Sequence, residues 1–273
     1  MVPLPDFERP PLVEVAVGFQ FDPLPLNSLH LGDIWGCAFR ERFPVLQPKP
    51  ALQPSFERFG VAPGQPQLRL LVNEQVPMRA WLLSETEDQL LQLQRDRFHF
   101  NWKRTDSGGA YPRFEWVVER FLEHLETLRS HLERNEVALT PINQCEVVYV
   151  NHIHPAEGVW DTFSQAGNAV PFAEVPNLQW LRDPENVEAR ARFVMTDGNG
   201  VPIGRLHAEL EPLHVIGTQS PLLGLKMIAR GTPVESTPES AQEFFELARE
   251  WIVRGFVDLT SPEMHRVWGR TDA

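Results

Sequence analysis

A strand pattern that occurs twice is the feature that most constrains the fold of this chain. Apolar residues occupy every second position from Val13 to Phe21, which predicts a strand with one buried face. The segment CEVVYVNHIHP at 145–155 aligns with VEVAVGFQFDP at 13–23 at a constant offset of 132 residues, so that Glu14 corresponds to Glu146. The recurrence predicts that the chain is built from two related halves.

The same order of elements follows each of these strands. In the first half we predict a helix at 29–43 that ends at Pro44, strands at 55–59, 67–72, 79–83 and 89–103, and a long helix with an apolar stripe from Phe114 to Leu132, opened by Pro112. A change of parity after Leu93 predicts a bulge or turn near Gln94. In the second half we predict a short helix at 160–165, strands at 189–195, 203–211 and 222–228, a hairpin turn at 197–200, a helix from Ser240, and a last helix that starts at 260–262.

These elements indicate an α+β fold in which long helices pack on one face of an antiparallel sheet. Each half contains a strand, a helix, an antiparallel meander and a long helix. We predict that an N-terminal half, residues 1–140, and a C-terminal half, residues 141–273, form one compact unit. The arrangement resembles the duplications of TATA-binding-protein-like or helix-grip folds.

Charge and composition disfavour several classes of protein. The 37 acidic and 25 basic side chains give a formal net charge of −12, which disfavours nucleic-acid binding except by a local patch. No apolar stretch approaches the ~20 residues of a membrane-spanning helix, and the N-terminal residues do not resemble a signal peptide, so we expect a cytoplasmic protein without membrane association. Cys37 and Cys145 have apolar neighbours and are expected in the core.

Common catalytic motifs are missing from the sequence. It contains no GxGxxG, GxxxxGK[ST], HExxH, GxSxG or CxxC pattern. Nucleotide hydrolysis, zinc proteolysis and esterase chemistry therefore have no support, and we expect no cofactor.

Three segments together resemble one protein family. They are PPLVEV at 10–15, QLQRDRFHFNWKR at 92–104 with YPRFE at 111–115, and WIVRGFVDLTSPEMHRVWGR at 251–270. They are similar to a sporadically distributed bacterial family of about this length that has no assigned reaction, cofactor or catalytic residues. The resemblance therefore places no role on any residue. Patchy distribution is usual for accessory genes of defence systems or mobile elements, and the resemblance implies a role of that kind.

The predicted strand at 95–104 is the first candidate binding site. Its basic side chains alternate with aromatic ones, so the two kinds point to opposite faces: Arg95, Arg97, His99 and Lys103 against Phe98, Phe100 and Trp102. Such a basic ladder suits a phosphate, a carboxylate or a single nucleic-acid strand. Nucleic-acid-binding sheets place their stacking aromatics on the same face as the basic residues, so this pattern favours a solvated outer face.

Glutamates and histidines form the candidate catalytic and metal sites. His152 and His154 lie two residues apart on a strand, and with Glu146 or His207 they would ligate a divalent metal. Glu14 and Glu146 occupy equivalent positions of the repeat, and paired carboxylates can do acid–base work. A metal site needs three or four convergent ligands, and nothing in the sequence shows that His207, His214 or Glu209 approaches this strand. A lone glutamate on a strand usually faces solvent, so we expect no metal site and favour structural roles.

The C-terminal segment is a candidate partner-binding site. Met264 and Trp268 lie on the predicted last helix, and exposed methionines and aromatics are common at binding surfaces. The alternative is a packed tail, and the burial of these two side chains distinguishes the alternatives.

We therefore favour a non-enzymatic binding protein whose sheet and flanking helices form a groove for a protein partner or small ligand. One alternative is an enzyme that uses Glu14, Glu146, His152, His154 and His207, which requires these side chains to converge in one pocket. The other is nucleic-acid binding through the 95–103 strand, which requires a local basic groove.

Overall fold

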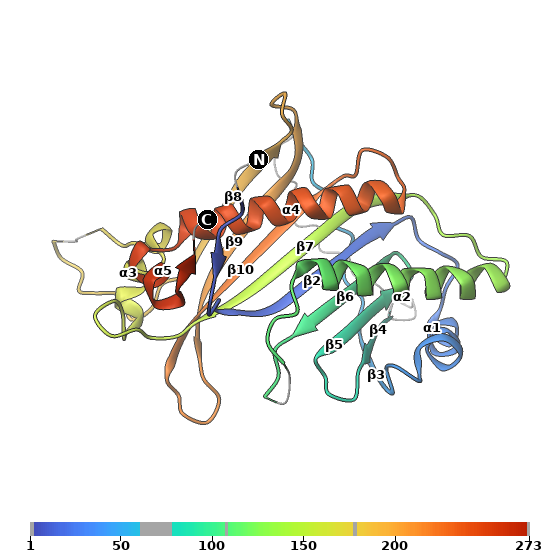
Figure 1. The fold of residues 1–273 in the computed structure, drawn as a ribbon, viewed down its shortest axis with the longest axis horizontal. Helices are drawn as coiled ribbons and strands as arrows, with labels where there is room; N and C mark the ends of the chain where they lie inside the picture. The colour runs from blue at the N-terminus through green and yellow to red at the C-terminus, as the bar shows by residue number, and fades with distance from the viewer. Residues whose placement is uncertain (1–2, 61–77, 107–108, 177–178, 272–273) are drawn as a thin grey trace.

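One antiparallel sheet, with nine strands among the described residues, organises the fold (Figure 1). The computed structural model describes residues 3–60, 78–106, 109–176 and 179–271. The strand order is β3-β4-β5-β6-β2-β7-β10-β9-β8. The strands are β2 (Leu12–Phe21), β3 (Val45–Pro50), β4 (Met78–Leu83), β5 (Gln89–Gln94), β6 (Arg97–Lys103), β7 (Ile142–Ile153), β8 (Ala189–Thr196), β9 (Pro202–His214) and β10 (Pro221–Gly231). A second, two-stranded sheet pairs β1 (Asp6–Phe7) with β11 (Arg270–Thr271) and so joins the ends of the chain.

The helices gather mainly on one face of the large sheet. They are α1 (Ser28–Ile34), α2 (Phe114–Arg134), α3 (Ala166–Ala169), α4 (Pro238–Leu259) and α5 (Pro262–Trp268), with a π-helical turn η1 (Trp35–Phe39) and 3-10 turns η2 (Phe163–Gln165) and η3 (Pro171–Ala173). The long helices α2 and α4 cross the same face of the sheet (Figure 1). They meet where Phe121 and Phe245 lie edge to face at 5.5 Å, and Phe121 also contacts Phe19 of β2 and Phe98 of β6. This layer is the hydrophobic core.

The two halves of the chain lay out their strands in the same way. From the centre outwards, β2 is followed by β6, β5, β4 and β3, and β7 is followed by β10, β9 and β8. At the central pair Ala16 lies opposite Val148, which is 132 residues further along the chain, the offset of the aligned segments. An internal twofold relation centred on this pair is what a duplication predicts. The duplication itself and the 1–140 and 141–273 division stay predictions.

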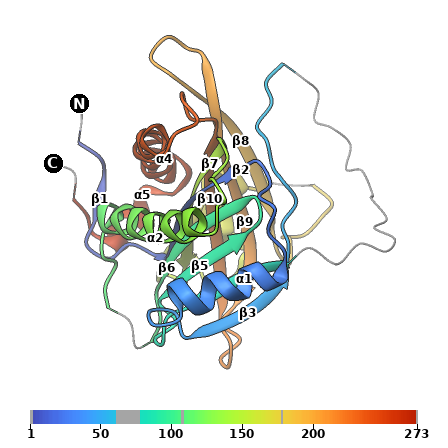
Figure 2. The same cartoon turned by 90° about the vertical axis from the view of Figure 1, so that its right-hand side faces the viewer.

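The face of the sheet opposite α2 and α4, which we call the outer face, carries polar side chains. Residues 51–59, which we call the strap, leave β3 and run across this face (Figure 2). The strap contains no helix or strand, whereas the sequence predicts a strand at 55–59. That prediction was wrong because the N–H groups of Ser55 and Glu57 bond to the side chains of Gln20 and Gln144 instead of to the backbone of a neighbouring strand. The strand predicted at 67–72 lies outside the described residues.

Most other predicted elements are present, with shifted boundaries. The 89–103 run is two strands that turn at Arg95 and Asp96, as the parity change near Gln94 predicted. The first predicted helix is α-helical only to Ile34 and then widens into the π-turn. Helix α2 begins at Phe114, after Arg113 at a positive φ of 80°, so Pro112 precedes the helix rather than opening it. Cys145 is buried, but Cys37 is exposed, so its predicted core position was wrong.

No helix within the described ranges is both long and apolar enough to span a membrane.

Candidate functional site

The outer face is built by the side chains that alternate with the core residues of each strand. Cross-strand pairing brings them into rows that run across the sheet. One row, the glutamine row, contains Gln94 of β5, Arg97 of β6, Gln20 of β2 and Gln144 of β7. All four side chains are buried, at 3–6% exposure, although they are polar. The strap accounts for this, because it lies directly on the row.

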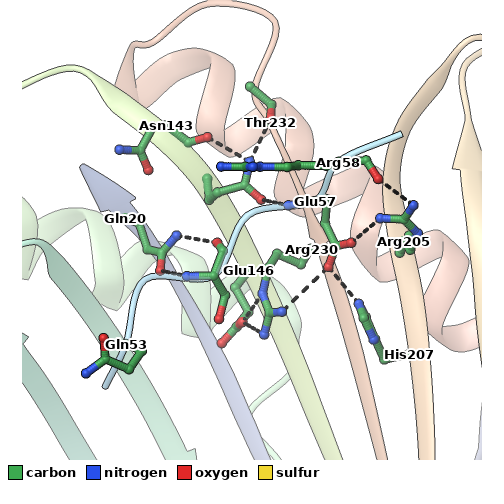
Figure 3. A network of polar contacts seen from close by, with 12 residues as sticks. Gln20, Gln53, Glu57, Arg58, Asn143, Glu146, Arg205, His207, Arg230 and Thr232 are labelled. Carbon is green, nitrogen blue, oxygen red and sulfur yellow. Dashed lines mark hydrogen bonds and ion pairs between the residues drawn. The ribbon is translucent and has the colours of Figure 1, made fainter. Parts of the chain in front are cut away.

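Every member of the glutamine row bonds to the backbone of the strap. Gln94 holds Leu52 with two hydrogen bonds of 2.8 Å, accepting from its N–H and donating to its carbonyl. Gln20 holds Ser55 in the same two-way manner, at 2.9 and 2.6 Å. Figure 3 shows the two bonds of Gln20 to the strap.

The other two members complete the contact. Arg97 donates to the carbonyl of Gln53 at 3.2 Å and also to the Gln20 carbonyl oxygen, which orients that amide. Gln144 accepts from the N–H of Glu57 at 3.1 Å and is itself fixed by donating to Thr232 at 2.7 Å. The glutamine row therefore binds the main chain of an extended segment and makes no hydrogen bond to its side chains, all of which the structure describes.

The side chain of Glu57 is held in a cationic cradle on the neighbouring strands (Figure 3). Arg205 and His207 of β9 donate to its two carboxylate oxygens at 2.6 and 2.7 Å. A guanidinium nitrogen of Arg230 on β10 lies 3.6 Å from Glu57 Oε1. Only 7% of the Glu57 side chain is exposed. Burial alone would raise the pKa of Glu57, but the bonds from His207 and Arg205 and the charge of Arg230 lower it to about 2. The cradle therefore holds an ionised carboxylate firmly.

A second acidic group lies beside the cradle. The carboxylate of Glu146 accepts from Arg230 Nε at 2.6 Å, and its other oxygen is 3.8 Å from His99 Nε2. The burial of His99 lowers its pKa to about 3, so this imidazole is neutral at pH 7 and the negative charge of Glu146 is balanced by Arg230 and, more weakly, by Arg97. Gly18 makes room for the ring, because a Cβ at Gly18 would lie 2.1 Å from His99 Cδ2.

The other half of the outer face carries cations around a tryptophan. Lys49 of β3 and Lys103 of β6 place their Nζ atoms 4.7 and 5.0 Å from the ring centre of Trp81, and the Arg79 guanidinium lies at 5.3 Å. We call these four residues the Trp81 cluster. Gln92 fixes its geometry by accepting from Arg79 at 2.8 Å and from the Trp81 indole at 3.2 Å.

The residues predicted to be catalytic do not converge in one pocket. Glu146 and His207 belong to one network, linked through Arg230 and Glu57. Glu14 lies opposite Val150, four residues along β7 from Glu146, and its carboxylate accepts a hydrogen bond from Asn101 at 2.5 Å. His152 lies opposite Gly224 of β10, whereas His207 lies opposite Ile228, four residues further along the same strand, so the two histidines are about 13 Å apart along the strand direction. His154 is exposed, just beyond the end of β7. In the described part of the chain, no three His, Cys, Asp or Glu side chains gather as a metal site requires.

Two further predictions are corrected by burial. Met264 and Trp268 are 1% and 5% exposed, because Trp268 packs on Phe7 and Phe256. They form the packed tail and present no surface to a partner. Arg97 and His99, expected on a solvated face, are each 5% exposed, while Arg95 lies exposed at the β5–β6 turn and Lys103 joins the Trp81 cluster.

The sequence does not predict the strap, and of the residues that hold it only Arg97 and His207 are among the candidates that the sequence indicates. Glu57 was assigned to a predicted strand, and Arg205 and Arg230 were not singled out. Arg205 and His207 share one parity in the predicted 203–211 strand, and this signal was available. Nothing local links either residue to Glu57, which is about 150 residues earlier.

Comparison with protein-family models, with curated proteins and with solved structures found no match.

Proposed function

We propose that this chain is a non-enzymatic binding protein that recognises an extended, acidic peptide segment of a protein partner on its outer face. The strap then occupies the site as a built-in pseudo-ligand. One observation carries the proposal: four side chains in register on four strands bond to the backbone of a single extended segment, and a cationic cradle receives its glutamate.

The dimensions fit an extended chain. From Leu52 to Glu57 an extended chain spans about 17 Å, and the three strand spacings from β5 to β7 span about 14 Å. Two-way amide contacts recognise any residue's backbone, whereas Arg205, His207 and Arg230 demand an anion at one position. The site therefore combines general and specific recognition, as peptide-binding sites do.

The strap is replaceable without loss of the core. None of residues 51–59 belongs to the hydrophobic core cluster, and Leu52 and Phe56 are 40% and 48% exposed. Among the described residues, the strap makes no backbone hydrogen bond to a strand. The surface beneath it is polar and accepts water, so an exchange of segments exposes no core residue.

A peptide added in trans tests the proposal. The strap is disabled by replacing residues 52–57 with glycine and serine at the same length, and separately by Glu57→Lys. A labelled peptide with the sequence of 51–59 is then titrated and followed by fluorescence anisotropy. We expect at least ~10-fold tighter binding to both variants than to the unmodified chain, because the intact strap competes at high effective concentration.

Two controls distinguish binding that depends on the glutamate from non-specific binding of the peptide. A peptide in which glutamine replaces the glutamate should lose most of this affinity, and so should the intact peptide on a strap-disabled chain that also carries Arg205→Gln. Circular dichroism establishes that each variant is folded. Absence of binding to folded variants, or equal binding of a scrambled peptide, contradicts the proposal.

A further inference from the structure

Strands β3 to β6 collect cations on the outer face without any acidic residue. Their sequences, VLQPKP, MRAWLL, QLLQLQ and RFHFNWK, contain no aspartate or glutamate, although the chain has 37 acidic residues. Their four cations, Lys49, Arg79, Arg97 and Lys103, all point to the outer face. The chain has only three lysines, and the third, Lys226 of β10, lies on the same face.

Within the part of the chain that the structure describes, no ion pair neutralises the cations of the Trp81 cluster. Among the ion pairs of the described residues, none includes Lys49, Arg79 or Lys103. Glu14 lies opposite Lys103 in the sheet, but its carboxylate accepts from Asn101. Arg97 stands near Arg79, and burial together with this like charge lowers the pKa of Arg79. Gathering like charges in this way is unfavourable unless an anion joins them.

We infer that the Trp81 cluster is a binding site for a phosphate group, independent of the peptide site. The three cations lie around the Trp81 ring, and phosphate suits such a group of charges better than a single carboxylate: a terminal phosphate offers three oxygens and up to two negative charges, and successive phosphodiesters of a strand offer one charge each. The indole of Trp81 gives an aromatic surface beside the phosphate, so the ligand is a nucleotide or a single nucleic-acid strand. The aromatics of β6 point to the core, and Trp81 of β4 takes their place on the basic face.

Two probes distinguish the sources of the phosphate. Inorganic pyrophosphate is titrated by calorimetry, and fluorescein-labelled oligo-dT by anisotropy, both at low salt. The test variant is Lys49→Gln with Lys103→Gln, and the matched control is Lys226→Gln, since Lys226 is on the same face opposite Glu209 and outside the cluster. We expect the double variant to weaken binding at least ~10-fold and the control to change it less than ~2-fold.

Binding of oligo-dT that weakens steeply with salt assigns a nucleic-acid strand, and binding of pyrophosphate alone assigns a compact phosphate ligand; both support the site. The inference is overturned if neither probe binds, or if Lys226→Gln weakens binding as much as the double variant. The strap peptide is not used in these titrations. A negative result here therefore leaves the proposed peptide site untouched, and a negative result with the peptide leaves the phosphate site untouched.

Discussion

At the scale of single residues, Gly18 shows how one missing side chain shapes the outer face. A Cβ at this position would lie 2.4 Å from the carbonyl oxygen of Phe98 as well as against the His99 ring. The oxygen belongs to a strand backbone and cannot turn aside. We expect Gly18→Ala to lower the free energy of unfolding by about 1–3 kcal/mol or more, measured by urea denaturation.

Gly32 is the matched control for this substitution. It lies in helix α1, and a Cβ there would have no neighbour within 4 Å. Gly32→Ala should raise the free energy of unfolding by about 0.4–1 kcal/mol, since alanine favours the helix. Equal effects of the two substitutions would contradict the crowding at Gly18.

The pKa of Glu57 makes strap closure depend on pH. Its pKa is about 2 with the strap closed and 4.5 as an ordinary glutamate. A lowered pKa stabilises the closed strap fully above pH 4.5, and the stabilisation is lost as the pH falls from 4.5 towards 2. The shift corresponds to about 3 kcal/mol.

Hydrogen exchange measures this effect at the amides of Leu52, Ser55 and Glu57, which bond to the glutamine row. Above pH 4.5 these amides should be better protected in the unmodified chain than in Glu57→Gln. The difference should vanish towards pH 2. A difference that stays constant over this range would mean that the carboxylate does not hold the strap.

At the scale of elements, the sequence patterns are informative where one face of an element is buried. Apolar alternation located β2 and β7, and an apolar stripe located α2 and α4, because core contact imposes the period of each element. The strap has no such period, since it is held by polar side chains from strands distant in sequence. This is why the cradle for Glu57 could not be predicted while His207 within it could be singled out.

The contact between α2, α4 and the sheet centres on Phe121. The centre of its ring lies 5.3 Å from that of Phe19 in β2, 5.7 Å from Phe98 in β6 and 5.5 Å from Phe245 in α4. Phe121 therefore connects α2 to α4 and to the strands beneath them. We expect Phe121→Ala to cost about 3–5 kcal/mol of unfolding free energy in urea denaturation.

Phe193 of β8 serves as the control, because it is 40% exposed. Phe193→Ala should cost much less, about 1 kcal/mol or under, since it leaves no buried cavity. A cost at Phe121 as small as that at Phe193 would show that the two helices are not fixed through this ring.

At the scale of the whole molecule, the contacts between the halves decide whether either half folds alone. Strands β2 and β7 pair along their lengths at the centre of the sheet, so cutting the chain leaves each with an unpaired edge. Phe121 and Phe245 pack across the division, and Glu57 of the first half is held by Arg205 and His207 of the second.

We therefore expect residues 1–140 and 141–273, made separately, to unfold without cooperativity and to aggregate, and their mixture to form a one-to-one complex with the circular dichroism of the intact chain. Size-exclusion chromatography and urea denaturation of the three samples provide the measurement. Cooperative unfolding of either half alone would show that a half supplies its own core. In that case the equivalence of the halves would extend from strand order to independent stability, and the central β2–β7 pairing would be an interface between two domains rather than the middle of one.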